Sequence, residues 1–442
     1  MSDIVILGSG IVGLCSAYHL LKSPALPPNS TVTILENSSD GSIASGASSK
    51  AGGFIAGARG GWCGEPSTDL ARLSWECHLE LVNELGGREK WGWRECGAVG
   101  LRVGGGGQSR SAYRDLPKGK KEVSDRDWLN GEREDLTNGA GGVAAAIGQI
   151  DPEQFCRTLH AHLSKDQRFK TIFGSTKSLS PATASPSSPR TLTFVKLGEK
   201  STTTIRFNTL IIAAGPWSAD VCSQLNLPKL NLVNLPGTSL LIRPALHTVG
   251  FMSDELLPSS AVFAGIGDAV SGVHAATSGT GRQLTEEEIA MGCTAAPELF
   301  PRTNGLVYIA GENSTPTVAA DHLPQRLPNR LPDNVVQVKQ LVDPLLVQRL
   351  TASAAAVSSA LDVSKGAVIE KEQFCYRPKT HDGEAIIGEL TKGTFVATGH
   401  GPWGITLAPG TGKIVAELVL TPGKPLSADI SGLGLSRFAS KL

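Results

Sequence analysis

The sequence lacks an excess of charge, a long apolar run and paired cysteines. Its 442 residues carry 41 Lys and Arg against 41 Asp and Glu, whereas a nucleic-acid-binding protein needs a basic excess to neutralise phosphates. No apolar run approaches the roughly 18 residues that span a membrane. The eight cysteines form no Cys-x-x-Cys pair and no Cys/His cluster with zinc spacing. We therefore expect no metal site and a reduced, intracellular protein.

Glycine is abundant instead, with 51 residues that gather in short runs without a collagen-like period. The usual content is about 7%, so the surplus indicates tight backbone turns. Hydrophobic residues make up 40% of the chain, which is enough for large cores and argues against disorder. The length predicts two or three domains.

The first 36 residues predict a βαβ unit. Residues 3–7 form an apolar strand, the glycine motif of residues 8–13 follows at once, and residues 14–22 have helical periodicity. A second strand over residues 31–36 ends on an acidic residue. This context turns a weak glycine pattern into a specific indication of dinucleotide binding.

Each glycine of the motif has a physical role. Gly8 allows the tight turn, Gly10 lets a pyrophosphate approach the backbone, and Gly13 lets the helix pack closely on the strand. Glu36 is expected to accept hydrogen bonds from ribose hydroxyls, which disfavours NADP.

Three further segments favour FAD over NAD. Residues 42–53 are small and follow the acidic residue closely, and residues 210–218 form a strand that ends in a sharp turn. Residues 395–410 form a strand, a glycine loop and a helix expected to start near Gly410. A second helix N-terminus there suits the electron-rich end of an isoalloxazine ring.

Taken in this order, the motifs resemble the D-amino acid oxidase superfamily of FAD-dependent oxidoreductases, within it the glycine oxidase and sarcosine oxidase branch and its fungal relatives. Residues 60–145 and 225–300 are too divergent to place. The resemblance covers residues 1–55, 151–218, 307–312 and 376–420.

The resemblance implies an α/β fold in which a Rossmann-type FAD-binding domain is interleaved with a mixed α+β substrate domain on a largely antiparallel sheet. We assign residues 1–75, 143–222 and 379–442 to the FAD-binding domain, and residues 76–142 and 223–378 to the substrate domain. The expected FAD contacts are Gly8, Gly10, Ile11, Val12, Gly13, Glu36, Asn37, Ser45, Ser48, Lys50, Gly52, Gly53, Ala214, Gly215, Trp217, Cys375, Arg377, Gly399, His400, Gly401, Trp403, Gly404, Ile405 and Thr406.

Residues 376–388 resemble the Arg-Pro…Asp-Gly…Ile-Gly segment of glycine-oxidase-like members. By that resemblance Arg377 holds the substrate carboxylate, for which a guanidinium fork offers two parallel charge-assisted hydrogen bonds. The alternative is a structural arginine that pairs with Asp382 or a loop carbonyl.

Cys375 precedes Asp382 by seven residues, the spacing at which sarcosine-oxidase-like members attach their flavin covalently. Those members lack the Arg-Pro pair found here, so we favour a buried, inert cysteine over a thioether to FAD.

Two more residues are candidates for catalysis. Lys50 would place a positive charge beside the flavin, or else face phosphate or solvent. His400 would lie by the ring through its backbone, with general-base action as the weaker alternative. Trp403 is expected to pack against the flavin, and Trp217 to pack in the core.

The predicted activity is FAD-dependent oxidation of the C–N bond of an amine or amino acid, with O2 reduced to H2O2. The alternatives are a dehydrogenase, a tailoring oxidase of a larger secondary amine, or a low-turnover flavoprotein with a trafficking or scaffold role. Ser440-Lys441-Leu442 is the tripeptide that the peroxisomal import receptor reads. We therefore expect a peroxisomal protein, or a cytoplasmic one if the tripeptide is coincidental.

Overall fold

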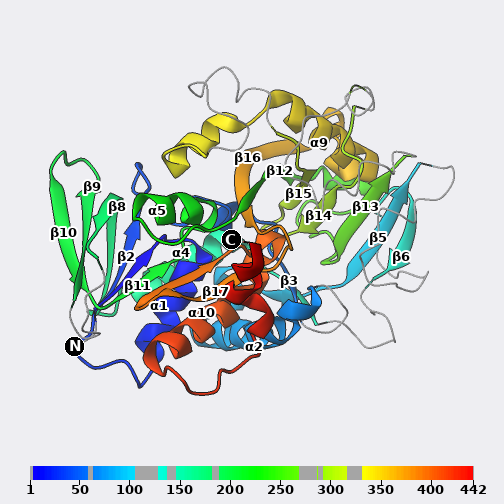
Figure 1. The fold of residues 1–442 in the computed structure, drawn as a ribbon. Coiled ribbons are helices and arrows are strands. Elements are labelled where there is room, and N and C mark those ends of the chain that lie inside the picture. The colour runs from blue at the N-terminus through cyan, green and yellow to red at the C-terminus, as the bar shows by residue number, and fades with distance from the viewer. Residues whose placement is uncertain are drawn as a thin grey trace.

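The computed structural model describes residues 3–57, 63–104, 128–136, 146–181, 189–267, 286, 292–315 and 331–441. Figure 1 shows two sheets side by side, with helices below the first and one long helix, α9, above the second. Three glycines of the run at residues 104–107 lie outside the described residues, as do residues 108–127 and 137–145 of the polar segment that follows.

The first sheet has eight strands in the order β10-β9-β8-β2-β1-β11-β18-β17. Its five central strands run parallel, whereas β9, β10 and β17 add antiparallel edges. This is the doubly wound sheet that the N-terminal motif predicts. The strands are β1 (Ile4–Leu7), β2 (Val32–Glu36), β8 (Phe169–Leu179), β9 (Arg190–Lys196), β10 (Thr202–Phe207), β11 (Thr209–Ile212), β17 (Ile386–Thr391) and β18 (Thr394–Thr398).

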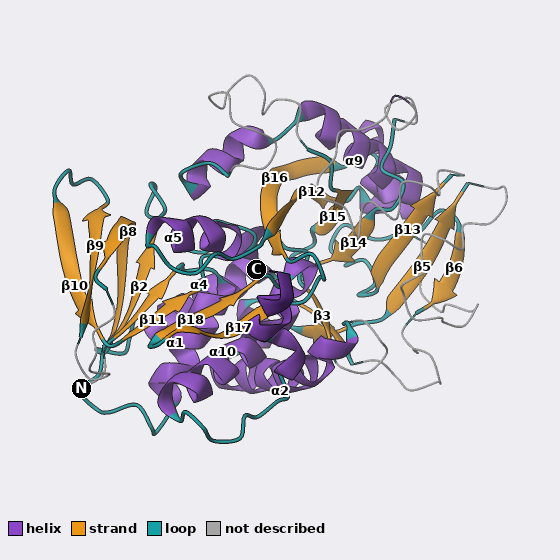
Figure 2. Ribbon diagram, in the orientation of Figure 1, coloured by secondary structure: helices purple, strands orange, loops and turns teal. Residues whose placement is uncertain are grey.

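Four helices contribute to the core on one face of this sheet, and Figure 2 shows helices in purple below the strands. Alternate residues of β1 face opposite sides: Ile4 and Ile6 join the core with these helices, while Val5 and Leu7 pack with the β9–β10 side. A small helix, α5 (Ser218–Gln224), lies on that other side. The four helices are α1 (Ile11–Lys22), α2 (Thr68–Leu85), α4 (Pro152–Leu163) and α10 (Gly404–Leu420), and α3 (Gly87–Lys90) follows α2.

Helix α10 begins at Gly404, so the predicted start near Gly410 is wrong. Pro409 lies inside the helix and cannot donate to the carbonyl four residues earlier. His78 Nε2 bonds that carbonyl, Ile405 O, at 3.0 Å, and Ser74 Oγ bridges the next broken pair. Because α2 replaces the missing backbone bonds, the helix continues through a residue that would otherwise stop it.

The second sheet has seven strands in the order β16-β12-β15-β14-β13-β5-β6. Only β5 and β13 pair in parallel, so the expected largely antiparallel sheet is confirmed. Helix α9 (Pro344–Val357) packs on one face, and the opposite face turns toward the first sheet. The strands are β5 (Ala98–Val103), β6 (Glu132–Asp135), β12 (Val233–Arg243), β13 (Ala261–Ile266), β14 (Glu298–Pro301), β15 (Val307–Glu312) and β16 (Val368–Lys379).

A small sheet joins the two parts. It consists of β3 (Phe54–Ala56), β7 (Ile147–Gln149) and β4 (Arg94–Glu95). The expected domain boundary after residue 75 falls inside α2, which packs along α10 in the first core. No helix in the described ranges is long and apolar enough to cross a membrane.

Candidate cofactor and substrate site

A cavity of about 1460 Å³ lies between the carboxyl ends of the parallel strands and one face of the second sheet. Gly8, Glu36, Ala213 and Thr398 line it where β1, β2, β11 and β18 end. Ligands of open parallel sheets bind at this edge. The cavity is larger than the roughly 300–1,000 Å³ of ordinary small-molecule pockets, so it has room for a large cofactor and a substrate together.

The turn after β1 is built by close backbone approaches. Gly8 has φ +107°, and a Cβ there would lie 2.6 Å from Ala213 O. A Cβ on Gly13 would lie 2.1 Å from Gly8 O, so this glycine packs the helix onto the turn and does not line the cavity. Gly10 has only Ser48 Oγ nearby, at 3.3 Å, and its backbone borders the open space.

Two helix N-termini open into the cavity. Neither α1 nor α10 has a side-chain hydrogen bond at its N-cap. Ser48 Oγ accepts from Ile11 N at 3.0 Å beside the first, and Gly404 and Ile405 line the cavity at the second. The helix dipoles at both points favour negatively charged groups.

Glu36 ends β2 at the cavity edge. Its Oε2 accepts hydrogen bonds from Ser9 N at 2.7 Å and Ser9 Oγ at 2.6 Å. Burial raises the pKa of the Glu36 carboxyl, although the Ser9 hydrogen bonds oppose the shift. The carboxyl group is thus fixed at the position where a ribose hydroxyl would meet it.

The small-residue segment after β2 crosses between the two sheets. Lys50 donates from Nζ to Ser45 O at 2.8 Å, and burial lowers the pKa of its ammonium group. Gly52 touches the second sheet, because a Cβ there would lie 2.4 Å from the Phe300 ring. Gly53 has φ +86° and passes against Ile150 O.

His400 and Trp217 make contacts within the protein. His400 Nε2 is 3.0 Å from Thr411 Oγ1 of α10, and burial lowers the pKa of the ring to about 4, so the ring is neutral at pH 7. Trp217 donates from Nε1 to Pro332 O at 2.8 Å and packs beside Phe374 and Tyr376.

Arg377 lies on β16 and reaches across β12. Its Nη2 donates to Pro236 O at 3.0 Å and to Asn313 Oδ1. The guanidinium lies over Gly237, where a Cβ would be 2.7 Å from Nη2. Its Nε is buried and has no hydrogen-bond partner within the described structure. Asp382 bonds Thr380 and Arg437, so the pairing with Arg377 considered from the sequence is not made.

The predicted cofactor residues converge on this one cavity. All of them line it except Gly13, Gly399 and Thr406. Cys375 lines it from β16, opposite Gly237 in the strand register. Asn37 borders it and bonds Asp333 O.

Sequence reasoning missed polar residues of the second sheet that line the cavity, among them Glu298 on β14, Tyr308 on β15 and Asn313 just after it. Burial raises the pKa of Tyr308 to about 12. The strand alternation of β14 and β15 places Glu298, Phe300, Tyr308 and Ala310 on the cavity face. That alternation was the available signal, but it does not say which face binds a ligand.

Comparison with known proteins decides the family. The profile of the family described as FAD dependent oxidoreductase (DAO) matches residues 3–418. The chain belongs to this family. This FAD-dependent oxidoreductase is 25% identical over 443 residues to a Schizosaccharomyces pombe protein named only as an oxidoreductase, with 97% of this chain and 96% of that protein covered.

Solved structures share the fold of this oxidoreductase. Glycine oxidase from Geobacillus kaustophilus superposes with a TM-score of 0.63 at 21% identity over 99% of both chains. L-proline dehydrogenase from P. horikoshii superposes with a TM-score of 0.65 at 16% identity, over 99% of this chain and 98% of that one.

The cavity fits FAD on its own geometry. The backbone at Gly8 and Gly10 leaves no side chain in the way, two helix N-termini face inward, and Glu36 stands at the far strand. The turn at Gly8 and Gly10 with the N-terminus of α1 would hold the pyrophosphate, and the N-terminus of α10 would lie beside the flavin. Glu36 would bind the ribose.

Proposed function

We propose that this oxidoreductase oxidises the C–N bond of an amine or amino acid whose carboxylate is held by Arg377. The observation that carries the proposal is the Arg377 guanidinium, which lies on the cavity wall with its buried Nε unsatisfied. A guanidinium on a cavity wall suits a carboxylate, because charge-assisted hydrogen bonds are the strong ones. The names of glycine oxidase and L-proline dehydrogenase, two structural neighbours, support an amino acid as substrate.

Bound FAD supplies a two-electron acceptor for the hydride that leaves the substrate carbon. The protein's own residues orient the substrate and enclose it. Asn313 and the Pro236 carbonyl fix the Arg377 fork, and Phe263, Phe300 and Tyr308 form an apolar wall that keeps water from the reacting C–H.

Lys50 adds a fixed positive charge on the flavin side of the cavity. Its charge would favour an electron-rich cofactor ring. No protein base is needed when the neutral amine binds: the substrate loses a hydride from carbon and a proton from nitrogen, and water hydrolyses the imine. Dioxygen then takes the two electrons with two protons and leaves as hydrogen peroxide.

The test is an anaerobic titration of the purified holoprotein with amino acids and N-methyl amines. We expect one class to bleach the flavin band, and air to restore it with one hydrogen peroxide per turnover. Bleaching without peroxide would indicate a dehydrogenase. A flavin that no amine bleaches would contradict the proposal and favour a low-turnover role.

Arg377→Met tests the carboxylate site directly. We expect at least about a hundredfold weaker binding of carboxylate ligands, because a charge-assisted hydrogen-bonded pair is lost. Arg243→Met is the matched control, since Arg243 lies on β12 but pairs with Glu370 at the surface. Equal affinity in both variants would contradict the assignment.

We propose that FAD is held without a covalent bond, although Cys375 lines the cavity. Acid precipitation checks this: a yellow supernatant is expected, and a yellow pellet that turns colourless in Cys375→Ala would overturn it.

We also propose that Ser440-Lys441-Leu442 directs the protein to peroxisomes. The preceding Arg437 is anchored to Asp382 and to Glu384 O. A fluorescent fusion with a free C-terminus should colocalise with a peroxisomal marker and become cytoplasmic when the tripeptide is deleted. Unchanged localisation after deletion would refute the proposal.

A further inference from the structure

Glu298 is a carboxylate on the cavity wall that the proposed oxidation does not use. It begins β14 and is partly exposed. No hydrogen bond or ion pair from another described residue reaches its side chain, although Glu298 lines the cavity together with Arg377. A carboxylate in this position is costly unless a partner compensates its charge.

The strand order places Glu298 and Arg377 on the same face of the second sheet, which forms the floor of the cavity. Arg377 lies on β16 and Glu298 on β14, with β12 and β15 between them. The Arg377 side chain crosses β12 above Gly237 and reaches Asn313 at the end of β15. Glu298 stands on the next strand, opposite Ala310. With strands about 4.8 Å apart, the two charged groups are separated by roughly one or two strand spacings.

The floor between the two charges is made of small residues. Gly237 and Ala310 both line the cavity there, and neither carries a side chain larger than a methyl group. The two charges interact electrostatically. Burial raises the pKa of Glu298, and the positive charge of Arg377 opposes that shift. A molecule with a negative end at Arg377 and a positive end at Glu298 would fit this spacing.

Aromatic rings flank the approach to Glu298. Phe263 is its register partner on β13, and Phe300 is two residues further along β14. The Phe300 ring stacks on Tyr308 at 5.9 Å and on Phe54 at 5.7 Å. Such a wall buries an aliphatic stem by the hydrophobic effect, and its π faces attract a cation.

We propose that Glu298 binds a second, cationic group of the substrate, so that the preferred substrate is an α-amino acid whose side chain ends in an ammonium or guanidinium group. This inference rests on the proposed amino-acid oxidation at the same site. Arg377 holds the carboxylate, the aromatic wall packs on the methylenes, and Glu298 receives the charged tip.

The test compares lysine with norleucine, which has a similar aliphatic stem but no terminal ammonium. Both enantiomers are titrated anaerobically into the holoprotein, and the dissociation constant is measured from the perturbed flavin spectrum. We expect lysine to bind at least about tenfold more tightly than norleucine, as a charge-assisted hydrogen bond predicts. In Glu298→Gln this preference should vanish while norleucine affinity changes less than about twofold.

A second variant separates charge from folding. Glu298→Leu should invert the preference in favour of norleucine, provided that its melting temperature and flavin content match the wild type. If either falls, the isosteric Glu298→Gln decides. Equal binding of both probes by the wild type, or an equal loss of both in Glu298→Gln, would overturn the inference.

The two proposals fail in different ways. If norleucine reduces the flavin and lysine does not, amino-acid oxidation stands and the role of Glu298 is refuted. If no amino acid or amine perturbs or reduces the flavin, the proposed function fails and the inference falls with it.

Discussion

The two sheets meet the cavity with different kinds of groups. The eight-stranded sheet presents mostly backbone: the turn at Gly8 and Gly10 and the open N-termini of α1 and α10. The seven-stranded sheet presents side chains from the faces of its strands, chiefly Arg377, Glu298 and Tyr308.

A site built from backbone requires glycine at fixed positions, because a Cβ would collide, as at Gly8 and Gly13. Such a site leaves a readable motif. A site built from strand side chains leaves in the sequence only the alternation of inward-facing and outward-facing residues, which any half-buried strand shows. The first arrangement suits a cofactor that many enzymes share, and the second can change residue by residue with the substrate.

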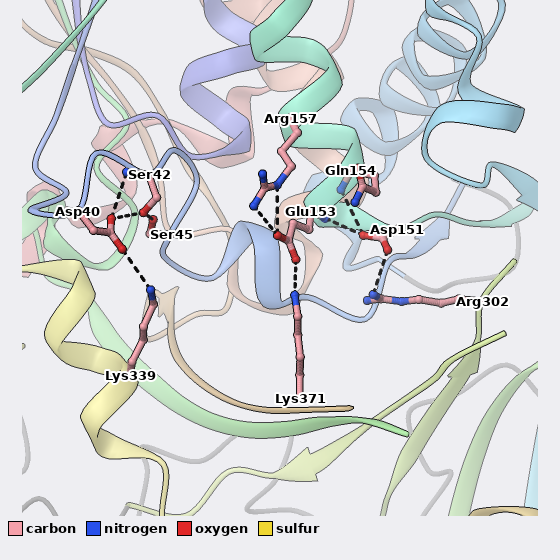
Figure 3. Close-up of polar contacts among 10 residues, drawn as sticks. All are labelled: Asp40, Ser42, Ser45, Asp151, Glu153, Gln154, Arg157, Arg302, Lys339 and Lys371. Carbon is pink, nitrogen blue, oxygen red and sulfur yellow. Dashed lines mark hydrogen bonds and ion pairs between the residues drawn. The ribbon is translucent and has the colours of Figure 1, made fainter. Parts of the chain in front are cut away.

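Ion pairs also cross between the two regions, and three of them are drawn in Figure 3. Arg302 pairs with Asp151 at the start of α4, and its side chain is only 4% exposed. Lys371 pairs with Glu153 and Lys339 with Asp40, and both lysines are at least half exposed. The buried pair should therefore matter most.

Arg302→Met should have the largest effect. Arg302 Nη2 donates to Ala51 O at 3.0 Å and Nη1 lies 3.4 Å from Asp151 Oδ2, so the variant leaves Ala51 O without this donor and removes the buried positive charge beside Asp151. We expect a loss of about 3–5 kcal/mol in the free energy of unfolding and faster release of flavin. Urea denaturation and flavin fluorescence measure both. A loss below about 1 kcal/mol would show that the regions do not depend on this contact.

Acid should destabilise the cofactor region first. Burial lowers the pKa of His78 and of His400 to about 4. A histidine kept neutral in the fold stabilises the protein above its unfolded pKa of about 6.5, and this contribution is lost as the pH falls from about 6.5 to about 4.

In His78→Gln an amide can still donate to Ile405 O but does not titrate. The variant should lose up to about 3 kcal/mol less than the wild type over this pH range. Urea denaturation at each pH measures the free energy of unfolding of both proteins. If the two free energies fall in parallel with pH, His78 does not cause the loss of stability.

Gly13→Ala tests the backbone-built site. Its Cβ would lie 2.1 Å from Gly8 O, so the turn or the helix must shift. We expect a loss of about 1–3 kcal/mol and a lower flavin content after purification. Gly46→Ala is the control, because its Cβ would make an ordinary contact 3.7 Å from Trp217. Normal flavin binding in Gly13→Ala would show that the close approach is dispensable.

Local signals predicted the elements that local physics determines. The βαβ unit is as expected, and its strands and helix follow one another within the first 36 residues. The start of α10 could not be predicted, because Pro409 is tolerated only through Ser74 and His78, more than 300 residues away in the chain. The side chains that share a floor with Arg377 depend on strand order, which a single sequence does not specify.

Lys371→Met should have the smallest effect and so sharpens the comparison with Arg302. Lys371 Nζ lies 2.8 Å from Glu153 Oε2, and its side chain is 50% exposed. Glu153 also keeps Arg157 at 2.8 Å, so the carboxylate is not left alone. We expect a loss below about 1 kcal/mol that disappears at high salt, with unchanged flavin content.

The two variants remove the same unit of charge from contacts on neighbouring residues of α4 and its cap. If Lys371→Met costs as much as Arg302→Met in urea denaturation, charge alone holds the two regions together. If only Arg302→Met is costly, burial is the cause, because the same ion pair is screened by water at one position and enclosed between the two sheets at the other.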